Sequence, residues 1–122
     1  MARILVVDDE PDVRGLIRLV LELDGHTVEE APHGLAALDA MTRVVPDVLM
    51  TDFMMPVMDG GRLIEAVRAD AQLQRMPIIV VSASLHGVLA ADIVMHKPFI
   101  PAELRSAVHR VLGSQAGATP PC

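Results

Sequence analysis

The sequence contains no tryptophan and no tyrosine, and aromatic residues make up only 2% of its 122 residues. It has a single cysteine, Cys122, so no disulfide can form within one chain, and we expect a reducing, cytoplasmic location. It has no apolar run long enough to cross a membrane, and the short apolar segment after Arg3 is too short for a signal-peptide core. Secreted disulfide-rich domains and integral membrane proteins are therefore excluded.

Clusters of basic residues are also missing. Ten Lys and Arg residues stand against sixteen Asp and Glu residues, which gives a net charge of −6. We therefore expect no direct binding to nucleic acid and no attachment to a membrane surface. Hydrophobic residues make up 52% of the chain, and its length is enough to bury a substantial core, so we expect one compact domain.

Short, uninterrupted apolar runs are what the sequence does contain. Such runs are typical of strands that are buried on both faces of a parallel sheet. A weaker segment, Thr27–Ala31, alternates in polarity and is expected at a sheet edge. The four unbroken runs are Ile4–Val7, Val48–Met50, Ile78–Val81 and Ile93–Met95.

Segments with the apolar period of a helix lie between these strands. Pro11 stands in the first turn of the first helix, and Asp59 precedes the third. Alternating strands and helices predict an α/β fold with right-handed crossovers. The periodic residues are Val13, Leu16, Ile17, Val20 and Leu21; Leu35, Leu38 and Met41; Leu63, Ile64 and Val67; and Leu104, Ala107, Val108 and Val111.

Three features at the C-terminal side depart from a regular pattern. Only ten residues, 83–92, join the fourth run to the fifth, so the fourth helix is expected to be short or missing. Ile100 occupies the capping position of the last helix, where it would either form an interface or contact the neighbouring turn. Residues 1–112 are expected to form the domain, and residues 113–122 a flexible tail or linker remnant.

Polar residues follow four of the predicted strands at the point where each strand ends. They are Asp8 and Asp9, Asp52, Ser82, and Lys97. Each has an ordinary explanation on its own: Asp9 could cap the next helix, and Asp52 could stabilise a turn. Because ligands bind at the carboxyl ends of strands in open α/β sheets, their coincidence favours one shared site.

The residue types at these strand ends indicate phosphoryl chemistry. Three neighbouring carboxylates repel one another unless a cation joins them, and carboxylates without His or Cys suit Mg²⁺. An ammonium and a hydroxyl group can then bind phosphoryl oxygens. A carboxylate can itself accept the phosphoryl group, and Asp52, alone at the centre of the set, is the candidate acceptor.

The motifs ILVVDDEPDVR, DVLMTDFMMPVMDG, IIVVSAS and HKPF together resemble the receiver domain of two-component response regulators, over residues 3 to about 112. The resemblance implies a flavodoxin-like, doubly wound, five-stranded parallel sheet of order 2-1-3-4-5 with helices on both faces. It implies that a sensor histidine kinase or phosphotransfer protein phosphorylates Asp52 in a Mg²⁺-dependent reaction, which changes binding to a protein effector. The implied metal ligands are Asp9 directly, Asp8 mainly through water, Asp52 and the backbone carbonyl of Met54; Ser82 and Lys97 would bind phosphoryl oxygens.

Two departures bear on function. The family usually has an aromatic switch residue three positions before the lysine, where this sequence has Val94. A haloacid-dehalogenase-like phosphatase, one alternative function, would carry an acid at the position of Met54. The other alternative is a receiver-like interaction module that is never phosphorylated, although all five site residues are present. We expect no enzyme activity beyond self-phosphorylation and autodephosphorylation.

The five histidines show no spacing typical of metal ligands and are expected to be surface or loop residues. They are His26, His33, His86, His96 and His109.

Overall fold

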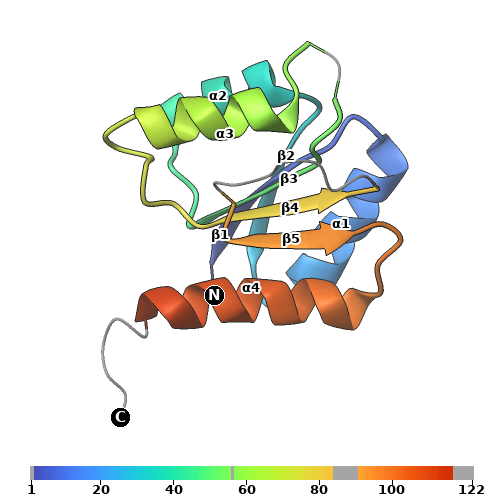
Figure 1. The fold of residues 1–122 in the computed structure, drawn as a ribbon. Helices are drawn as coiled ribbons and strands as arrows, with labels where there is room; N and C mark the ends of the chain where they lie inside the picture. Colours follow the sequence, from blue (N-terminus) through green and yellow to red (C-terminus); the bar gives the residue numbers. More distant parts are fainter. Residues whose placement is uncertain (1, 56, 84–90, 117–122) are drawn as a thin grey trace.

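In the part of the chain that the structure describes, five parallel strands form one sheet with two helices on each face (Figure 1). The structure, a computed structural model, describes residues 2–55, 57–83 and 91–116. The strand order β2-β1-β3-β4-β5 confirms the doubly wound fold that the sequence predicts. The strands are β1 (Arg3–Val7), β2 (Thr27–Ala31), β3 (Val48–Thr51), β4 (Ile78–Ser82) and β5 (Ile93–His96). The helices are α1 (Pro11–Leu23), α2 (Gly34–Arg43), α3 (Gly60–Ala69) and α4 (Pro101–Ala116).

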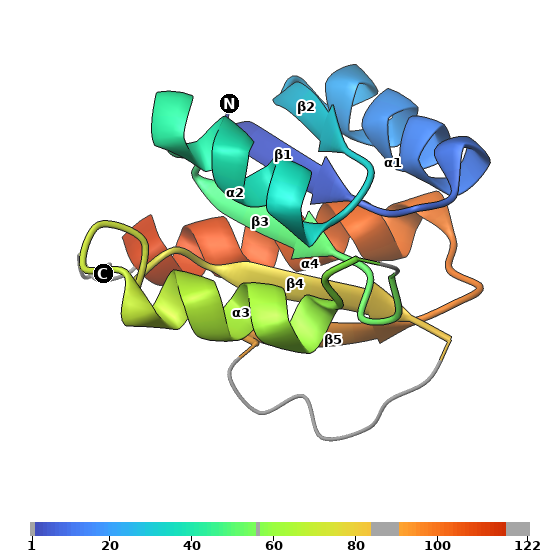
Figure 2. The same ribbon diagram turned by 90° about the horizontal axis from the view of Figure 1, so that it is seen from above.

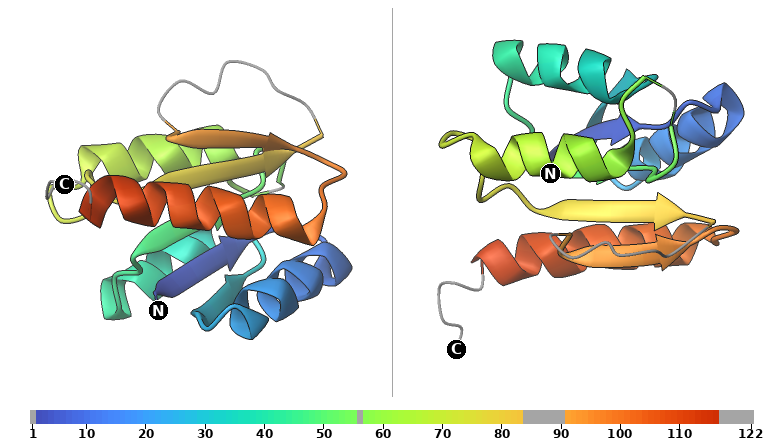
Figure 3. Two further views of the ribbon diagram at one scale, coloured as in Figure 1. Left: turned by 90° about the horizontal axis from the view of Figure 1, so that it is seen from below. Right: turned by 45° about the horizontal axis from the view of Figure 1, so that its top comes forward.

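The central strands are buried on both faces because each face carries its own hydrophobic core. Helices α1 and α4 cover one face and helices α2 and α3 the other, as the views from above and below show (Figures 2 and 3). In β1, Ile4 packs with α1 and α4, whereas Leu5 packs with α2 and α3. Alternate side chains of a strand point to opposite faces, so an unbroken apolar run is what this position requires.

The two edges of the sheet differ in how well the sequence predicted them. Strand β2 lies at one edge, as expected from its alternating pattern. Strand β5 forms the other edge, so the prediction that it is buried on both faces was wrong. Met95 is buried in the core shared with α4, Ile93 packs against that core while only partly buried, and Val94 is 37% exposed. The reason is positional: β5 pairs with β4 alone.

The helix starts show how the backbone N–H groups of the first turns are satisfied. Asp59 caps α3 by accepting a hydrogen bond from the Arg62 N–H, as the sequence predicts. Ile100, the residue before α4, has no side-chain oxygen that could cap the helix. Instead, Glu103 Oε1 in the first turn accepts the Ile100 N–H at 2.9 Å. This reciprocal bond is half of a capping box, which the sequence analysis overlooked. The Ile100 side chain is 59% exposed.

Helix α4 continues to Ala116, past the domain boundary expected at residue 112. The fourth helix of the sequence prediction, expected to be short or missing, is not α4: it was placed between β4 and β5, in residues 83–92. Residues 84–90 of this segment lie outside the described residues. Among the described helices, none combines the length and the hydrophobicity needed to cross a membrane.

Candidate functional site

The carboxyl ends of β1 and β3 place two acidic residues next to each other. These strands are paired in parallel with Val7 opposite Thr51. The pairing continues one residue further, because the Asp52 N–H donates to the Val7 carbonyl at 2.9 Å. Carboxylate oxygens of Asp8, Asp9 and Asp52 consequently lie within 4.8 Å of one another. The structure therefore assembles the acidic cluster that the strand ends predict.

The three carboxylates have different surroundings. Asp8 is buried, and its two oxygens are engaged: Oδ1 accepts the Glu10 N–H at 2.9 Å and Oδ2 accepts from the Lys97 ammonium at 2.9 Å. Asp52 is also buried, and its Oδ1 lies 3.4 Å from the Met54 nitrogen. Asp9 is exposed, and its carboxylate accepts no hydrogen bond from any part of the chain that the structure describes.

Lys97 reaches this cluster from the far edge of the sheet. Its backbone N–H donates to the Ser82 carbonyl at 2.9 Å, which extends the β4–β5 pairing to the start of the following loop. From there the ammonium lies 2.9 Å from Asp8 and 3.3 Å from Asp52. Ser82 itself is buried at the end of β4. The structure thus brings Lys97 into contact with the two buried carboxylates and holds Ser82 beside it.

The charges of the site do not balance. Burial raises the pKa of Asp52, and the negative charge of Asp8 adds to this effect, while the ammonium of Lys97 opposes it. Burial also opposes the charge of Lys97, but its hydrogen bond to Asp8 and the charges of Asp8 and Asp52 outweigh burial, so its pKa is raised. Three carboxylates around one ammonium leave an excess of negative charge, which a divalent cation would neutralise.

The donor set fits Mg²⁺. The ligand atoms are carboxylate oxygens, with no imidazole or thiolate in the cluster, and Mg²⁺ is commonly held by one or two carboxylates together with waters. Asp9 has a carboxylate free to bind an ion directly, whereas both oxygens of Asp8 already hold other groups. The direct role of Asp9 and the indirect role of Asp8 stay predictions of the family resemblance.

The loop that follows Asp52 is held close to the site by its backbone. The Gly60 N–H donates to the Phe53 carbonyl at 2.7 Å. A Cβ atom on Gly60 would lie 2.4 Å from the Asp52 carbonyl oxygen, so only glycine fits there. Met54 is 62% exposed. The loop thus fixes the backbone of Asp52 and leaves Met54, two residues later, at the surface.

One residue near the site was missed by the sequence analysis. Glu10 Oε1 lies 3.4 Å from the Lys97 ammonium and brings a further carboxylate to the edge of the cluster. The only feature of the sequence that could have indicated a role for Glu10 was its position directly after Asp8 and Asp9. Glu10, and not Asp9, is the capping residue of α1, and its side chain makes no capping hydrogen bond. The ordinary explanation of Asp9 as a helix cap therefore fails.

The histidines were only partly predicted. His96 and His109 are exposed, as expected, and His33 caps α2 by accepting the Ala36 N–H on Nδ1. His26 lies in the loop between α1 and β2, as expected, but it is buried and does not lie at the surface. His86 lies outside the described residues.

Comparisons with known proteins agree with this geometry. The family model of the response regulator receiver domain matches residues 4–109. The chemotaxis protein CheY homolog of Campylobacter jejuni is 38% identical over 124 residues, covering 94% of this chain and 95% of that protein. The sensor histidine kinase TmoS of Ectopseudomonas mendocina is 38% identical over 117 residues, covering 90% of this chain but 12% of the kinase.

Solved structures show the same fold. The chemotaxis response regulator CheY4 of Vibrio cholerae superposes with a TM-score of 0.85 at 32% identity, covering 91% of this chain and 98% of that one. The response regulator protein TrrA of Thermotoga maritima, solved in complex with Mg(2+)-BeF, has a TM-score of 0.83 at 32% identity and covers 91% and 99% of the two chains. The chain therefore belongs to the response regulator receiver domain family, whose members act in phosphorelay signal transduction.

Proposed function

We propose that this chain accepts a phosphoryl group on Asp52 from a histidine-phosphorylated kinase or phosphotransfer protein. The observation that carries the proposal is the position of Asp52, a buried carboxylate at a strand end, 3.3 Å from the Lys97 ammonium and within reach of two further carboxylates. Such a carboxylate is poised to act as a nucleophile, because the groups that neutralise an incoming phosphoryl dianion surround it.

The reaction is a transfer between two nucleophiles. An Asp52 oxygen attacks phosphorus, the bond from phosphorus to the donor's imidazole nitrogen breaks, and an aspartyl phosphate forms. The Lys97 ammonium neutralises one phosphoryl oxygen, and the Ser82 hydroxyl donates a hydrogen bond to another. Attack of water on phosphorus later returns the free Asp52 carboxylate and inorganic phosphate. Self-phosphorylation and this slow autodephosphorylation are the only chemistry assigned to the chain.

Mg²⁺ would be held by Asp9 and Asp52, by the Met54 backbone carbonyl, and by Asp8 mainly through water. When bound, the ion supplies positive charge that offsets the repulsion between the carboxylates and the phosphoryl oxygens. The imbalance of charge around Lys97 supports this assignment, as does the relative TrrA, which was solved with Mg²⁺. An Asp9→Ala variant is expected to lose Mg²⁺ affinity in a titration; affinity equal to that of the parent would contradict the assignment.

The signal would leave the domain as changed binding to a protein effector. Val94, where the family usually has an aromatic residue, is partly exposed on β5 and borders a groove between β5 and α4. A β-branched side chain has few rotamers, so a rotating ring cannot report phosphorylation here. We therefore expect the change in binding to come from movement of the backbone around the site.

Intact-mass analysis with a small acyl phosphate tests the assignment of Asp52. In the presence of Mg²⁺ the chain should gain one phosphoryl group, and the gain should disappear in Asp52→Asn and in excess chelator. Asp39→Asn is the matched control, since Asp39 is an exposed carboxylate paired with Arg43 on α2. Full modification of the Asp52→Asn variant would overturn the proposal, and phosphopeptide mapping would then locate the true acceptor.

A further inference from the structure

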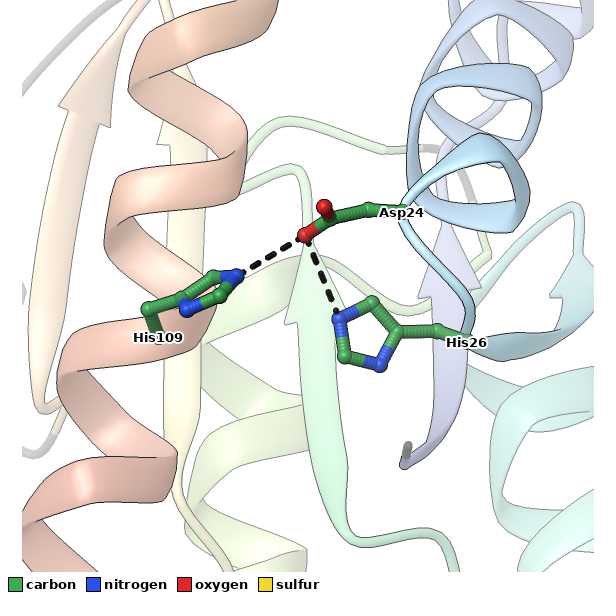
Figure 4. Close-up of side chains that lie close together, drawn as sticks. All are labelled: Asp24, His26 and His109. Carbon is green, nitrogen blue, oxygen red and sulfur yellow. Dashed lines mark hydrogen bonds and ion pairs between the residues drawn. The ribbon is translucent and has the colours of Figure 1, made fainter.

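Two histidines and an aspartate from three separate segments meet at the opposite end of the sheet from Asp52 (Figure 4). Asp24 ends α1, His26 precedes β2, and His109 lies on α4. Asp24 Oδ2 lies 2.9 Å from His109 Nε2 and 3.7 Å from His26 Nε2. Ligand atoms of all three residues lie within 4.8 Å of one another. Both imidazole rings therefore direct Nε2 towards the same carboxylate oxygen.

His26 is the residue that this arrangement leaves unsatisfied. Its side chain is only 5% exposed, and its Nε2 is buried without a hydrogen-bond partner among the described residues. The distance of 3.7 Å to Asp24 is too long for a hydrogen bond. An ion pair between Asp24 and His109 accounts for those two residues but leaves the buried nitrogen of His26 unexplained. Buried polar atoms without partners are rare enough to require an explanation.

We infer that Asp24, His26 and His109 form a binding site for a divalent transition-metal ion, with Zn²⁺ as the natural probe. Two imidazole nitrogens and one carboxylate oxygen are ligands that Zn²⁺ prefers, and sites with three protein ligands leave a fourth position to water. The Asp24 side chain is 25% exposed and that of His109 is 66% exposed, so solvent can reach this position.

The spacing of the three ligand atoms suits a tetrahedral ion. With bonds of roughly 2.0–2.1 Å, neighbouring ligands of Zn²⁺ lie about 3.4 Å apart. The two separations from Asp24 Oδ2, 2.9 and 3.7 Å, lie on either side of this value. A shift of the exposed His109 side chain would make room for the ion.

The charges of His26 and Asp24 at neutral pH are those that a metal ligand needs. Burial lowers the pKa of His26, which keeps the ring in the neutral form that binds metals. The hydrogen bond from His109 lowers the pKa of Asp24, which keeps the carboxylate ionised. The imidazoles become protonated as the pH falls, so metal binding should weaken in acid.

Metal binding has a specific structural consequence at the first strand. His26 Nδ1 accepts the Ala2 N–H at 3.1 Å, so the neutral ring carries its proton on Nε2. A metal at Nε2 requires the lone pair there, and the neutral ring must then carry its proton on Nδ1. The Ala2 N–H consequently loses its acceptor when the ion binds. The Ala2 amide is thus a reporter that a simple ion pair between Asp24 and His109 would not affect.

Calorimetric titration of the untagged full chain with Zn²⁺ tests the inference, in excess Mg²⁺ so that the acidic cluster is occupied. We expect one Zn²⁺ per chain, at least tenfold weaker binding in His109→Gln, and a zinc-dependent shift of the Ala2 amide resonance. His109→Gln alters an exposed side chain and should fold normally. The matched control is His33→Asn, which keeps a capping residue on α2 and should bind Zn²⁺ like the parent.

Two results would overturn the inference. One is equal zinc affinity in the parent and in His109→Gln, which would place the ion elsewhere. The other is a parent that shows neither zinc binding nor a shift of the Ala2 amide, which would indicate a bridging water or a plain ion pair. The Asp52→Asn variant should retain zinc binding, so failure here and failure of the proposed phosphorylation are distinguishable.

Discussion

The ammonium of Lys97 lies 2.9 Å from Asp8 Oδ2, although 89 positions separate the two residues in the sequence. The Asp8 side chain is 2% exposed and that of Lys97 15% exposed, so this is a largely desolvated ion pair. Asp52 shares the same ammonium at 3.3 Å. In the absence of a metal ion, Lys97 is therefore the counter-charge of two buried carboxylates and holds the ends of β1, β3 and β5 together.

Lys97→Met should destabilise the metal-free protein by about 3–5 kcal/mol, because it leaves two buried carboxylates without their cation. Mg²⁺ should recover part of the loss by taking over the neutralising role. Urea unfolding in chelator and in excess Mg²⁺ measures both effects. Arg43→Met is the control: its pair with Asp39 is exposed, so the change should be within about 0.5 kcal/mol. An unchanged unfolding free energy for Lys97→Met in chelator would contradict the prediction.

Gly60→Ala should destabilise the protein by about 1–3 kcal/mol, because the new methyl group would lie 2.4 Å from the Asp52 carbonyl oxygen and 2.7 Å from the Phe53 Cα. These are backbone atoms, so the loop that carries Asp52 must move, and phosphorylation should slow as well. Gly15→Ala is the matched control: nothing lies within 4 Å of the new atom on α1, so it should stabilise by about 0.5–1 kcal/mol. Similar unfolding free energies for the two variants would refute this account.

Met54→Asn should shorten the lifetime of the aspartyl phosphate several-fold. Met54 lies two residues after Asp52, with its nitrogen 3.4 Å from Asp52 Oδ1, and a thioether cannot orient an attacking water. An amide side chain at the same place can. Decay of the phosphorylated protein, followed by intact mass after removal of the donor, measures the effect. Leu35→Asn alters an exposed side chain on α2 and should leave the rate unchanged; slower or equal decay in Met54→Asn would count against the idea.

Glu30→Gln should remove a pH-dependent contribution to stability. Hydrogen bonds from Arg14 at 2.7 Å and from Arg18 at 3.0 Å hold the pKa of Glu30 below its usual value. The unfolded chain, with a pKa of about 4.3, then binds the proton more strongly than the folded one. The stabilisation is therefore complete above pH 4.3 and is lost as the pH falls below it.

The measurement is the difference in unfolding free energy between the parent and Glu30→Gln across this range. We expect it to be about 1 kcal/mol and constant between pH 6 and 8, and to shrink below pH 4.3. Glu29→Gln, an exposed neighbour on the same strand, should give a small difference that does not follow this pattern. A difference that grows as the pH falls would have the wrong sign for a lowered pKa.

The acidic cluster and Lys97 were predictable because the information that places them is local. Unbroken apolar runs identify the strands, and the first polar residue after each run must lie at the carboxyl edge of a parallel sheet. Asp8, Asp9, Asp52 and Lys97 could therefore be assigned to one site before any coordinates were known. The cap of α3 at Asp59 was equally local, since the capping bond spans only three residues.

Helix faces and sheet edges were less predictable, because burial depends on what lies opposite. Leu16 and Leu35 fit the apolar period of α1 and α2, yet they are 48% and 50% exposed. In α2 the alanines Ala37 and Ala40 face the sheet, since small side chains allow the helix to approach it closely. Strand β5 has the composition of a central strand, but its position in the sheet makes it an edge.

The sequence by itself determined the fold class and the acidic site, because both follow from periodicity and from residues at strand ends. Only the tertiary structure decided which distant side chains meet: Glu10 with Lys97, and Asp24 with His26 and His109. Asp24, His26 and His109 do not follow the spacing of any sequence motif. The packing of α4 against α1 brings them together, and their positions along the chain do not. Contacts of this kind depend on the relative placement of whole helices, which no local pattern encodes.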